Sequence, residues 1–157
     1  MPNTIARSVI REVEPLSADE LIAGAARKVL DSGLPGLPAV EGDGAFVGIF
    51  GEREFMTALF PGYVGELGSG AMIRRSIDDA IELREARSSE SIRKYLTTDH
   101  VMVEDDYSDT QIAEIFLHHR VLVVPVATAG RVHGVVTRAD YFAALFEKFE
   151  AAGAERP

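Results

Sequence analysis

The sequence predicts an α+β fold made of two copies of one β-α-β-β-α repeat. The first observation is that "GIFGEREFMTALF" at Gly48–Phe60 returns 86 residues later as "GVVTRADYFAALF" at Gly134–Phe146. The second is that a short apolar segment containing a proline, Pro38 or Pro125, precedes each copy. Because a repeat of this length marks a duplicated structural unit, these observations indicate two halves with the same architecture.

The first helix of each half is predicted from a serine that begins a capping box. Ser17–Glu20 and Ser108–Gln111 follow the pattern in which the serine hydroxyl accepts from an N–H three residues on, while Glu or Gln reaches back. Apolar residues then recur at helical spacing, as far as Leu30 in the first half and Phe116 in the second. Gly33 is typical of a helix end. We therefore expect helices that begin at the two serines.

Two strands and a closing helix follow in each half. The strands are predicted at Leu37–Val40 and Ala45–Phe50, and at Val124–Ala127 and Arg131–Thr137. Glycine-containing turns join the strands of each pair, which is typical of β-hairpins. The closing helices, Phe55–Phe60 and Tyr141–Phe149, carry aromatic residues on one face.

The repeats divide the chain into four parts. Residues 1–61 form the first repeat, 62–91 a helical linker, 92–150 the second repeat and 151–157 a tail. Within the linker, apolar residues between Ile73 and Leu83 predict an amphipathic helix. This helix either packs across the two repeats or presents a surface to a partner, and the sequence leaves both readings open.

Composition and motifs exclude several classes of function. A net charge of −9 repels nucleic acid and anionic lipid, and the absence of cysteine excludes disulfides and thiolate chemistry. No nucleophile–base pair, metal-binding motif or P-loop occurs. The most apolar run, Val121–Ala127, has seven residues, whereas a membrane helix needs about 20. We expect a cytoplasmic protein that is not an enzyme and has no catalytic residue, metal or bound cofactor.

The polar residues of the second copy suggest a ligand site. Thr137 follows a strand and precedes a helix, where free backbone N–H groups and the helix dipole favour phosphate. Asp140 lies one helical turn further on, and an ionised carboxylate can accept from both ribose hydroxyls. Arg138 adds a guanidinium for phosphate. The same T-x-x-D spacing is also a capping box, and Thr137 can serve both purposes.

The duplicated frame, the two proline strands and the signature G-h-h-T-x-x-D (h, apolar) at Gly134–Asp140 resemble a tandem pair of CBS domains, named after cystathionine β-synthase. The resemblance extends from about Thr4 to Phe149. It implies two repeats that pack sheet to sheet about a pseudo-twofold axis and form two clefts. Each cleft of such a pair can hold AMP, ADP, ATP or S-adenosylmethionine. It further implies a stand-alone regulatory module that forms a homodimer and acts on a protein target still to be identified.

The resemblance also implies one competent and one degenerate cleft. The competent cleft would combine Thr137, Arg138 and Asp140 with walls from the first repeat. Those wall residues are Thr4, Ser8, Leu34, Pro35, Gly36 and Leu37. In the other cleft, Gly51 and Glu54 replace the Thr/Asp pair, and Arg53 is the one basic side chain expected nearby.

The leading expectation is thus a non-catalytic, energy-sensing module that binds an adenine nucleotide. The alternative is a structural interaction protein whose clefts are filled by its own side chains, such as Leu34 or Phe50. The apolar faces of the two closing helices predict self-association in either case.

Overall fold

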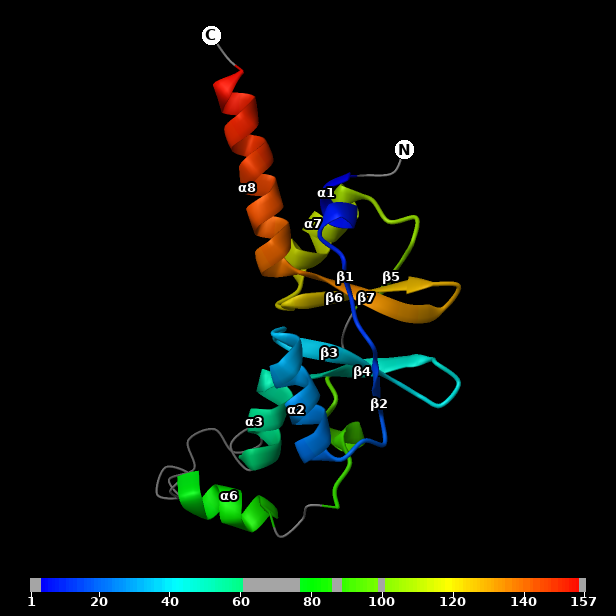
Figure 1. The fold of residues 1–157 in the computed structure, drawn as a ribbon, viewed down its shortest axis with the longest axis vertical. Helices are drawn as coiled ribbons and strands as arrows, with labels where there is room; N and C mark the ends of the chain where they lie inside the picture. The colour runs from blue at the N-terminus through cyan, green and yellow to red at the C-terminus, as the bar shows by residue number, and fades with distance from the viewer. Residues whose placement is uncertain (1–3, 61–76, 86–88, 99–100, 156–157) are drawn as a thin grey trace.

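Two small sheets face each other at the centre of the molecule, and helices cover their outer faces (Figure 1). The computed structural model describes residues 4–60, 77–85, 89–98 and 101–155. The mixed α+β architecture and the duplication predicted from the sequence are both confirmed. Each half contributes one hairpin, and the strands β3 and β6 make contact where the two halves meet.

The first sheet has the strand order β2-β3-β4. Its strands are β2 (Leu16–Ser17), β3 (Gly36–Val40) and β4 (Phe46–Gly51). The strand β2 runs parallel to β3, and β3 pairs with β4 as the predicted antiparallel hairpin. Helices α2 (Ile22–Ser32) and α3 (Glu52–Leu59) cover the outer face of this sheet.

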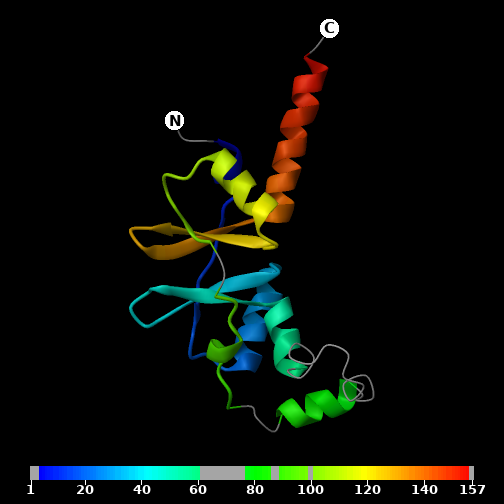
Figure 2. The ribbon, with the colours of Figure 1, turned by 180° about the vertical axis from the view of Figure 1, so that it is seen from behind.

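The second sheet has the order β1-β7-β6-β5. Its strands are β1 (Arg11–Glu12), β5 (Val103–Glu104), β6 (Val123–Thr128) and β7 (Arg131–Thr137). Helices α1 (Thr4–Ser8), α7 (Asp109–His118) and α8 (Arg138–Ala154) lie on its outer face. The view from behind shows the same layers and the long α8 projecting beyond them (Figure 2).

The two halves exchange strands. Although β1 precedes the first repeat, it pairs with β7 of the second, with Arg11 opposite Val135. Thr97, which lies 86 positions after Arg11, forms the matching bridge to Ile49 of β4. Gly134 and Gly48 permit this approach, because a Cβ atom there would lie 2.9 Å from the carbonyl oxygen of Arg11 and 2.8 Å from that of Thr97. The exchange gives the pair its pseudo-twofold relation.

The hydrophobic core also joins the halves. The cluster built around Leu16, Phe50 and Ile92 includes Val123 and Val135 of the second sheet. A second cluster, built around Tyr107, Ile112 and Val124, fills the space between the second sheet and its helices. The sheet interface is therefore part of a continuous core rather than a contact between two separate domains.

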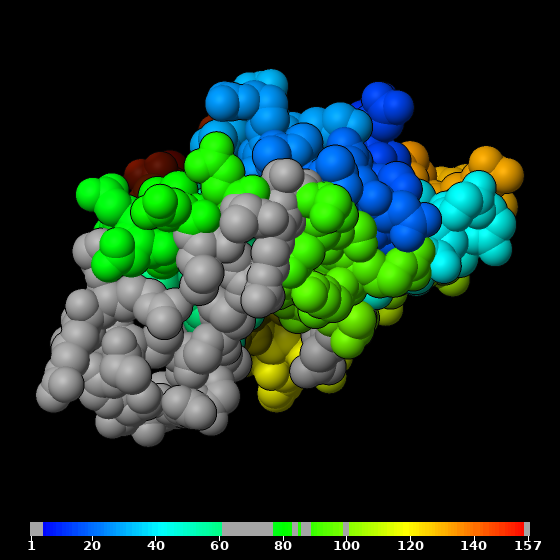
Figure 3. Space-filling model, turned by 90° about the horizontal axis from the view of Figure 1, so that it is seen from below, coloured from blue at the N-terminus to red at the C-terminus, as the bar shows by residue number. Residues whose placement is uncertain are grey.

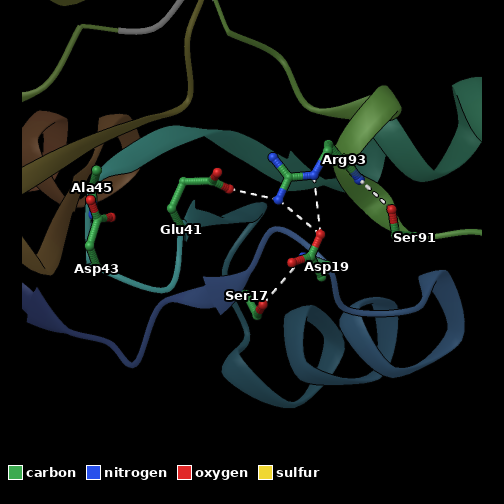
Figure 4. A network of polar contacts seen from close by, with 7 residues as sticks. All are labelled: Ser17, Asp19, Glu41, Asp43, Ala45, Ser91 and Arg93. Carbon is green, nitrogen blue, oxygen red and sulfur yellow. Dashed lines mark hydrogen bonds and ion pairs between the residues drawn. The ribbon is translucent and has the colours of Figure 1, made fainter.

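The segment from Ser91 to Thr97 packs on the first repeat, although the sequence places most of it in the second. It contains a short 3-10 helix, η1 (Ile92–Tyr95), and its Ile92 is fully buried in the first core. Arg93 bonds to Asp19 at 2.8 Å and to Glu41 at 2.7 Å, which ties η1 to the turn between β2 and α2 and to the β3–β4 hairpin (Figure 4).

The predicted start of α2 is wrong, whereas that of α7 is confirmed. Ser108 caps α7, its Oγ accepting from the N–H of Gln111 at 3.1 Å. Ser17 instead ends strand β2, and α2 begins only at Ile22. The reason is a tertiary contact: Leu21 forms a bridge with Ser91, and this pairing keeps the chain extended before α2. Gly33 ends α2 as predicted, with φ of +71°.

Both closing helices begin before their predicted starts at Phe55 and Tyr141: α3 begins at Glu52 and α8 at Arg138. The closing helix α8 continues to Ala154, through the predicted end at Phe149 and into the expected tail. The predicted linker helix is confirmed as α6 (Ile77–Glu85), which packs against α3 and has Ala80 buried. The predicted start at Ile73 lies outside the described residues. Figure 3 shows α6, α2 and the segment 89–98 together on the lower face of the molecule.

Candidate ligand-binding cleft

A cavity of about 590 Å³ opens between the start of α8 and the turn that links α2 to β3. We call it the Asp140 cleft. It is lined by Arg11, Gly33, Leu34, Pro35, Leu122, Thr137, Arg138, Ala139, Asp140 and Phe142. Its walls come from both repeats, because the α2–β3 turn belongs to the first and α8 to the second. Leu34, Pro35 and Phe142 supply an apolar side, while the charged groups lie at the helix start.

Thr137 is the N-cap of α8. Its side chain is buried, with 5% of the residue exposed, and its Oγ1 accepts from the N–H of Asp140 at 3.0 Å. The capping function read from the T-x-x-D spacing is therefore confirmed. The hydroxyl keeps its own proton as a donor, so the cap does not prevent a further hydrogen bond to a ligand.

Asp140 forms an ion pair that the sequence did not predict. Nε of Arg11 donates to Oδ2 at 2.6 Å, and a terminal guanidinium nitrogen donates to Oδ1 at 3.0 Å. The hydrogen bond from Arg11 is the main reason that the pKa of Asp140 lies below its ordinary value; burial acts in the opposite direction, and the charge of Arg11 lowers the pKa further. The carboxyl group is therefore ionised at neutral pH and engaged at both oxygens.

The other residues predicted for this cleft divide into two groups. Leu34 and Pro35 line it as expected. Gly36 lines the second cavity instead, and Leu37 is buried in the first core, because both belong to strand β3. Successive residues of a strand point to opposite faces of the sheet, and neither Gly36 nor Leu37 faces the Asp140 cleft.

The N-terminal wall also differs from the prediction. Residues Thr4–Ser8 form α1, which packs against α7 and α8 rather than entering the cleft. The side chain of Thr4 lies outside the described part of the structure. The Ser8 hydroxyl donates to the carbonyl of Ile5 at 2.7 Å, and Ser8 borders a separate shallow groove that also reaches Asp140. Arg11, three residues further on, takes the position expected for this segment.

The second cavity, of about 300 Å³, is related to the first by the repeat, and we call it the Glu54 cleft. Glu54 is buried, with 8% exposed, and accepts a hydrogen bond from Oγ1 of Thr97. Thr97 thus serves Glu54 as Arg11 serves Asp140, from equivalent positions on the exchanged segments. Among the described residues each carboxylate has a partner, and the cationic one belongs to Asp140.

Gly51 replaces Thr137 in this copy for a steric reason. A Cβ atom at Gly51 would lie 2.2 Å from the carbonyl oxygen of Pro35 and 2.6 Å from Cα of Gly36. Gly36 and Gly51 are paired across the β3–β4 hairpin, whereas Val123 and Thr137 are paired in the second repeat. The N-terminus of α3 therefore lies so close to strand β3 that a threonine side chain does not fit at position 51.

The expectation that Arg53 is the one basic residue near this cleft is wrong. His119 and Arg120 line the cavity as well, together with Glu52 and Glu54. They come from the end of α7 and the segment before β6, which the repeat symmetry brings to the same place as Gly33 and Leu34 in the other cleft. The Glu54 cleft therefore has two arginines balanced by two carboxylates, whereas the Asp140 cleft has two arginines and one carboxylate.

A match to a family model shows which family the second repeat belongs to. Residues 92–147 match the model of the CBS domain. The second repeat is a CBS domain. Its match covers the T-x-x-D signature, the strand β7 that leads into it and most of α8. None of the curated proteins matches the chain.

Solved structures of CBS-domain proteins share the fold of the chain at low sequence identity. A CBS domain-containing protein of unknown function from Kribbella flavida is 20% identical with a TM-score of 0.68, over 90% of this chain and 97% of that one. The CBS domain of a membrane protein from Sphaerobacter thermophilus is 22% identical with a TM-score of 0.66, over 89% and 91%. The protein CBSX2, solved in complex with AMP, is 15% identical with a TM-score of 0.65, over 93% and 98%. The chain therefore has the fold of a tandem CBS pair.

Two further observations apply to the described residues alone. They contain no group of three or more side chains arranged to hold a metal ion. None of their helices combines the length and hydropathy that a bilayer-spanning helix requires.

Proposed function

We propose that this CBS pair is a non-catalytic sensor that binds an adenine nucleotide, AMP, ADP or ATP, in the Asp140 cleft, with S-adenosylmethionine as a related candidate. The observation that carries the proposal is the placement of Thr137 and Asp140 at the start of α8 inside a cavity between the repeats. A change in the ligand would alter contacts with both halves at once. The module would report that change to a partner protein.

The chemistry of the cleft suits the three parts of a nucleotide. The ionised carboxylate of Asp140 can accept from the two ribose hydroxyls. Arg138 and the N-terminal end of α8 suit a phosphate. Leu34, Pro35 and Phe142 offer an apolar surface for the adenine ring. AMP bound to CBSX2, a protein of the same fold, supports this class of ligand.

The alternative with self-filled clefts has less support. Phe50 is fully buried in the first core, and Leu34 forms part of the cavity wall with 7% exposure. Neither side chain fills the Asp140 cleft. The alternative remains as an outcome of the binding test.

We propose that the Glu54 cleft is the weaker site. Gly51 offers no hydroxyl, and Glu52 lies at the helix start where Arg138 lies in the other copy. A carboxylate there opposes phosphate through its charge. Arg120 and His119 reduce this effect, so the two clefts are expected to differ in affinity rather than in the class of ligand.

Calorimetric titration with AMP, ADP, ATP and S-adenosylmethionine tests the proposal. The wild-type chain is expected to bind at least one of them, and Asp140→Asn to bind it at least about tenfold more weakly, because a charge-assisted hydrogen bond contributes about 1.5–3 kcal/mol. Glu54→Gln is the matched control, since it makes the same change in the other cleft and should leave the tighter site unaffected. At 100 times its Kd the ligand should stabilise the fold by about 2.7 kcal/mol in thermal unfolding.

Two results would contradict the proposal. If none of the four ligands binds or stabilises the chain, the structural alternative is favoured. If Asp140→Asn binds as tightly as the wild type, the ligand lies elsewhere.

We further propose that the working form is a homodimer that pairs through α8. Phe142, Phe146 and Phe149 are 67%, 50% and 76% exposed on this helix. Their spacing of three and four residues is that of a helix–helix seam.

A further inference from the structure

We propose that Arg11 determines ligand specificity in the Asp140 cleft: its ion pair with Asp140 must open before a ribose can bind, and the released guanidinium then favours a phosphorylated ligand over a neutral nucleoside. This inference rests on the proposed function. It assigns a role to a residue outside the T-x-x-D signature and makes ligand binding an exchange of partners at one carboxylate.

The geometry of the pair supports the first step. Arg11 engages both oxygens of Asp140, at 2.6 and 3.0 Å, in the bidentate arrangement that is the strongest form of this contact. A ribose diol also donates two hydrogen bonds to one carboxylate. The sugar and the guanidinium therefore compete for the same group.

The surroundings of Arg11 support the second step. Its backbone is held at the cleft by pairing with Val135 in the second sheet. Its side chain is 52% exposed, which leaves room for it to swing away from Asp140. Arg11 lines the same cavity as Thr137 and Arg138, which stand at the helix start. A guanidinium released from Asp140 is thus already beside the proposed phosphate position.

The second cleft provides an internal comparison. Thr97 occupies the position equivalent to Arg11 and gives Glu54 a neutral hydroxyl donor instead of a cation. Opening that contact would release no charge. The exchanged segments therefore distinguish the two clefts, in addition to the differences between Gly51 and Thr137.

Calorimetry of adenosine and AMP against three proteins tests the inference: the wild type, Arg11→Met and Arg138→Met. Methionine keeps the length of the side chain and removes its charge and donors. Arg11→Met is expected to bind adenosine about fivefold more tightly, since an exposed ion pair contributes up to about that factor. Its preference for AMP over adenosine should fall about tenfold, because one phosphate contact is lost. Arg138→Met should weaken AMP alone and leave adenosine binding unchanged.

Arg11→Lys provides a second variant that keeps the charge and loses the bidentate geometry. It is expected to bind adenosine more tightly than the wild type and to retain the preference for AMP. If Arg11→Met and Arg11→Lys both bind adenosine with wild-type affinity while AMP still binds the wild type, the ion pair does not oppose the ribose and the inference is overturned. If no protein binds any adenosine compound, the proposed function itself fails. Circular dichroism confirms that each variant is folded.

Discussion

Gly51 lies against Pro35 and Gly36 so closely that its missing side chain is a structural requirement. Gly51→Ala is expected to lower the free energy of unfolding by about 1–3 kcal/mol, because the new Cβ would lie 2.2 Å from a backbone oxygen that cannot move aside independently. Urea denaturation measures the change. Gly42→Ala is the control, since nothing lies within 4 Å of a Cβ there. Equal effects of the two substitutions would show that the close approach is not what excludes a side chain.

The ion pair between Arg11 and Asp140 predicts a pH dependence of stability. The pKa of Asp140 is lower in the folded chain than its ordinary value of 3.8, and the pKa of Arg11 is raised, so Arg11 stays charged. The contribution of the pair is therefore complete above about pH 4 and is lost as the pH falls through the lower folded pKa of Asp140. Its size is at most about 1 kcal/mol, because Arg11 is half exposed.

The measurement is the difference in unfolding free energy between the wild type and Arg11→Met. It should be positive and constant from pH 7 to about pH 5, and should decrease below about pH 4. A difference that does not change down to pH 2 would mean that the carboxylate gains nothing from its partner.

At the scale of residues, the sequence predicted which residues local spacing brings together in the Asp140 cleft. Thr137, Arg138 and Asp140 lie together because one helical turn brings them together. Arg11 could not be found in the same way, since it reaches Asp140 across 129 positions through a strand exchange that no motif announces. The steric reason for Gly51 was equally hidden, because it depends on how closely two backbones approach.

At the scale of elements, the two predicted capping boxes behave differently. Ser108→Ala is expected to destabilise the chain by about 1 kcal/mol, because it removes the N-cap of α7. Ser17→Ala should cost less, because Ser17 lies five residues before α2 and its hydroxyl accepts only from the N–H of Asp19. Thermal unfolding of both variants compares the two costs, and a larger loss for Ser17→Ala would contradict the assignment.

The hairpins, the closing helices and the end of α2 follow from local signals such as turn glycines and apolar spacing. The start of α2 does not, since the pairing of Leu21 with Ser91 overrides the local capping preference. The N-terminal segment was likewise misjudged, because α1 is held by Asp109, which accepts from the backbone N–H of Ala6 at 2.7 Å. Contacts between distant parts of the sequence decided both cases.

At the scale of the whole molecule, the projecting helix α8 carries the exposed apolar residues Phe142, Leu145, Phe146 and Phe149. Light scattering is expected to give about twice the 17.0 kDa mass of one chain, and Phe146→Glu to shift the mass toward a single chain, because a charge in an apolar seam opposes pairing. Glu150→Gln, on the same helix, should leave the dimer intact. A wild-type mass of 17.0 kDa at all concentrations, or a dimer that Phe146→Glu leaves unchanged, would exclude pairing through this face.

The exchange of β1 and the Thr97 segment has a consequence for the gene as well as for the fold. A fragment containing only one repeat would keep the segment that pairs with the sheet of the other repeat. It would lack the segment that pairs with its own sheet. Neither half is thus a self-sufficient unit, and two separately expressed fragments would be mutual complements. If one repeat were lost during evolution, the sheet of the remaining repeat would be incomplete. The first repeat is therefore needed for the fold of the second, although it has Gly51 and Glu54 in place of the Thr/Asp pair.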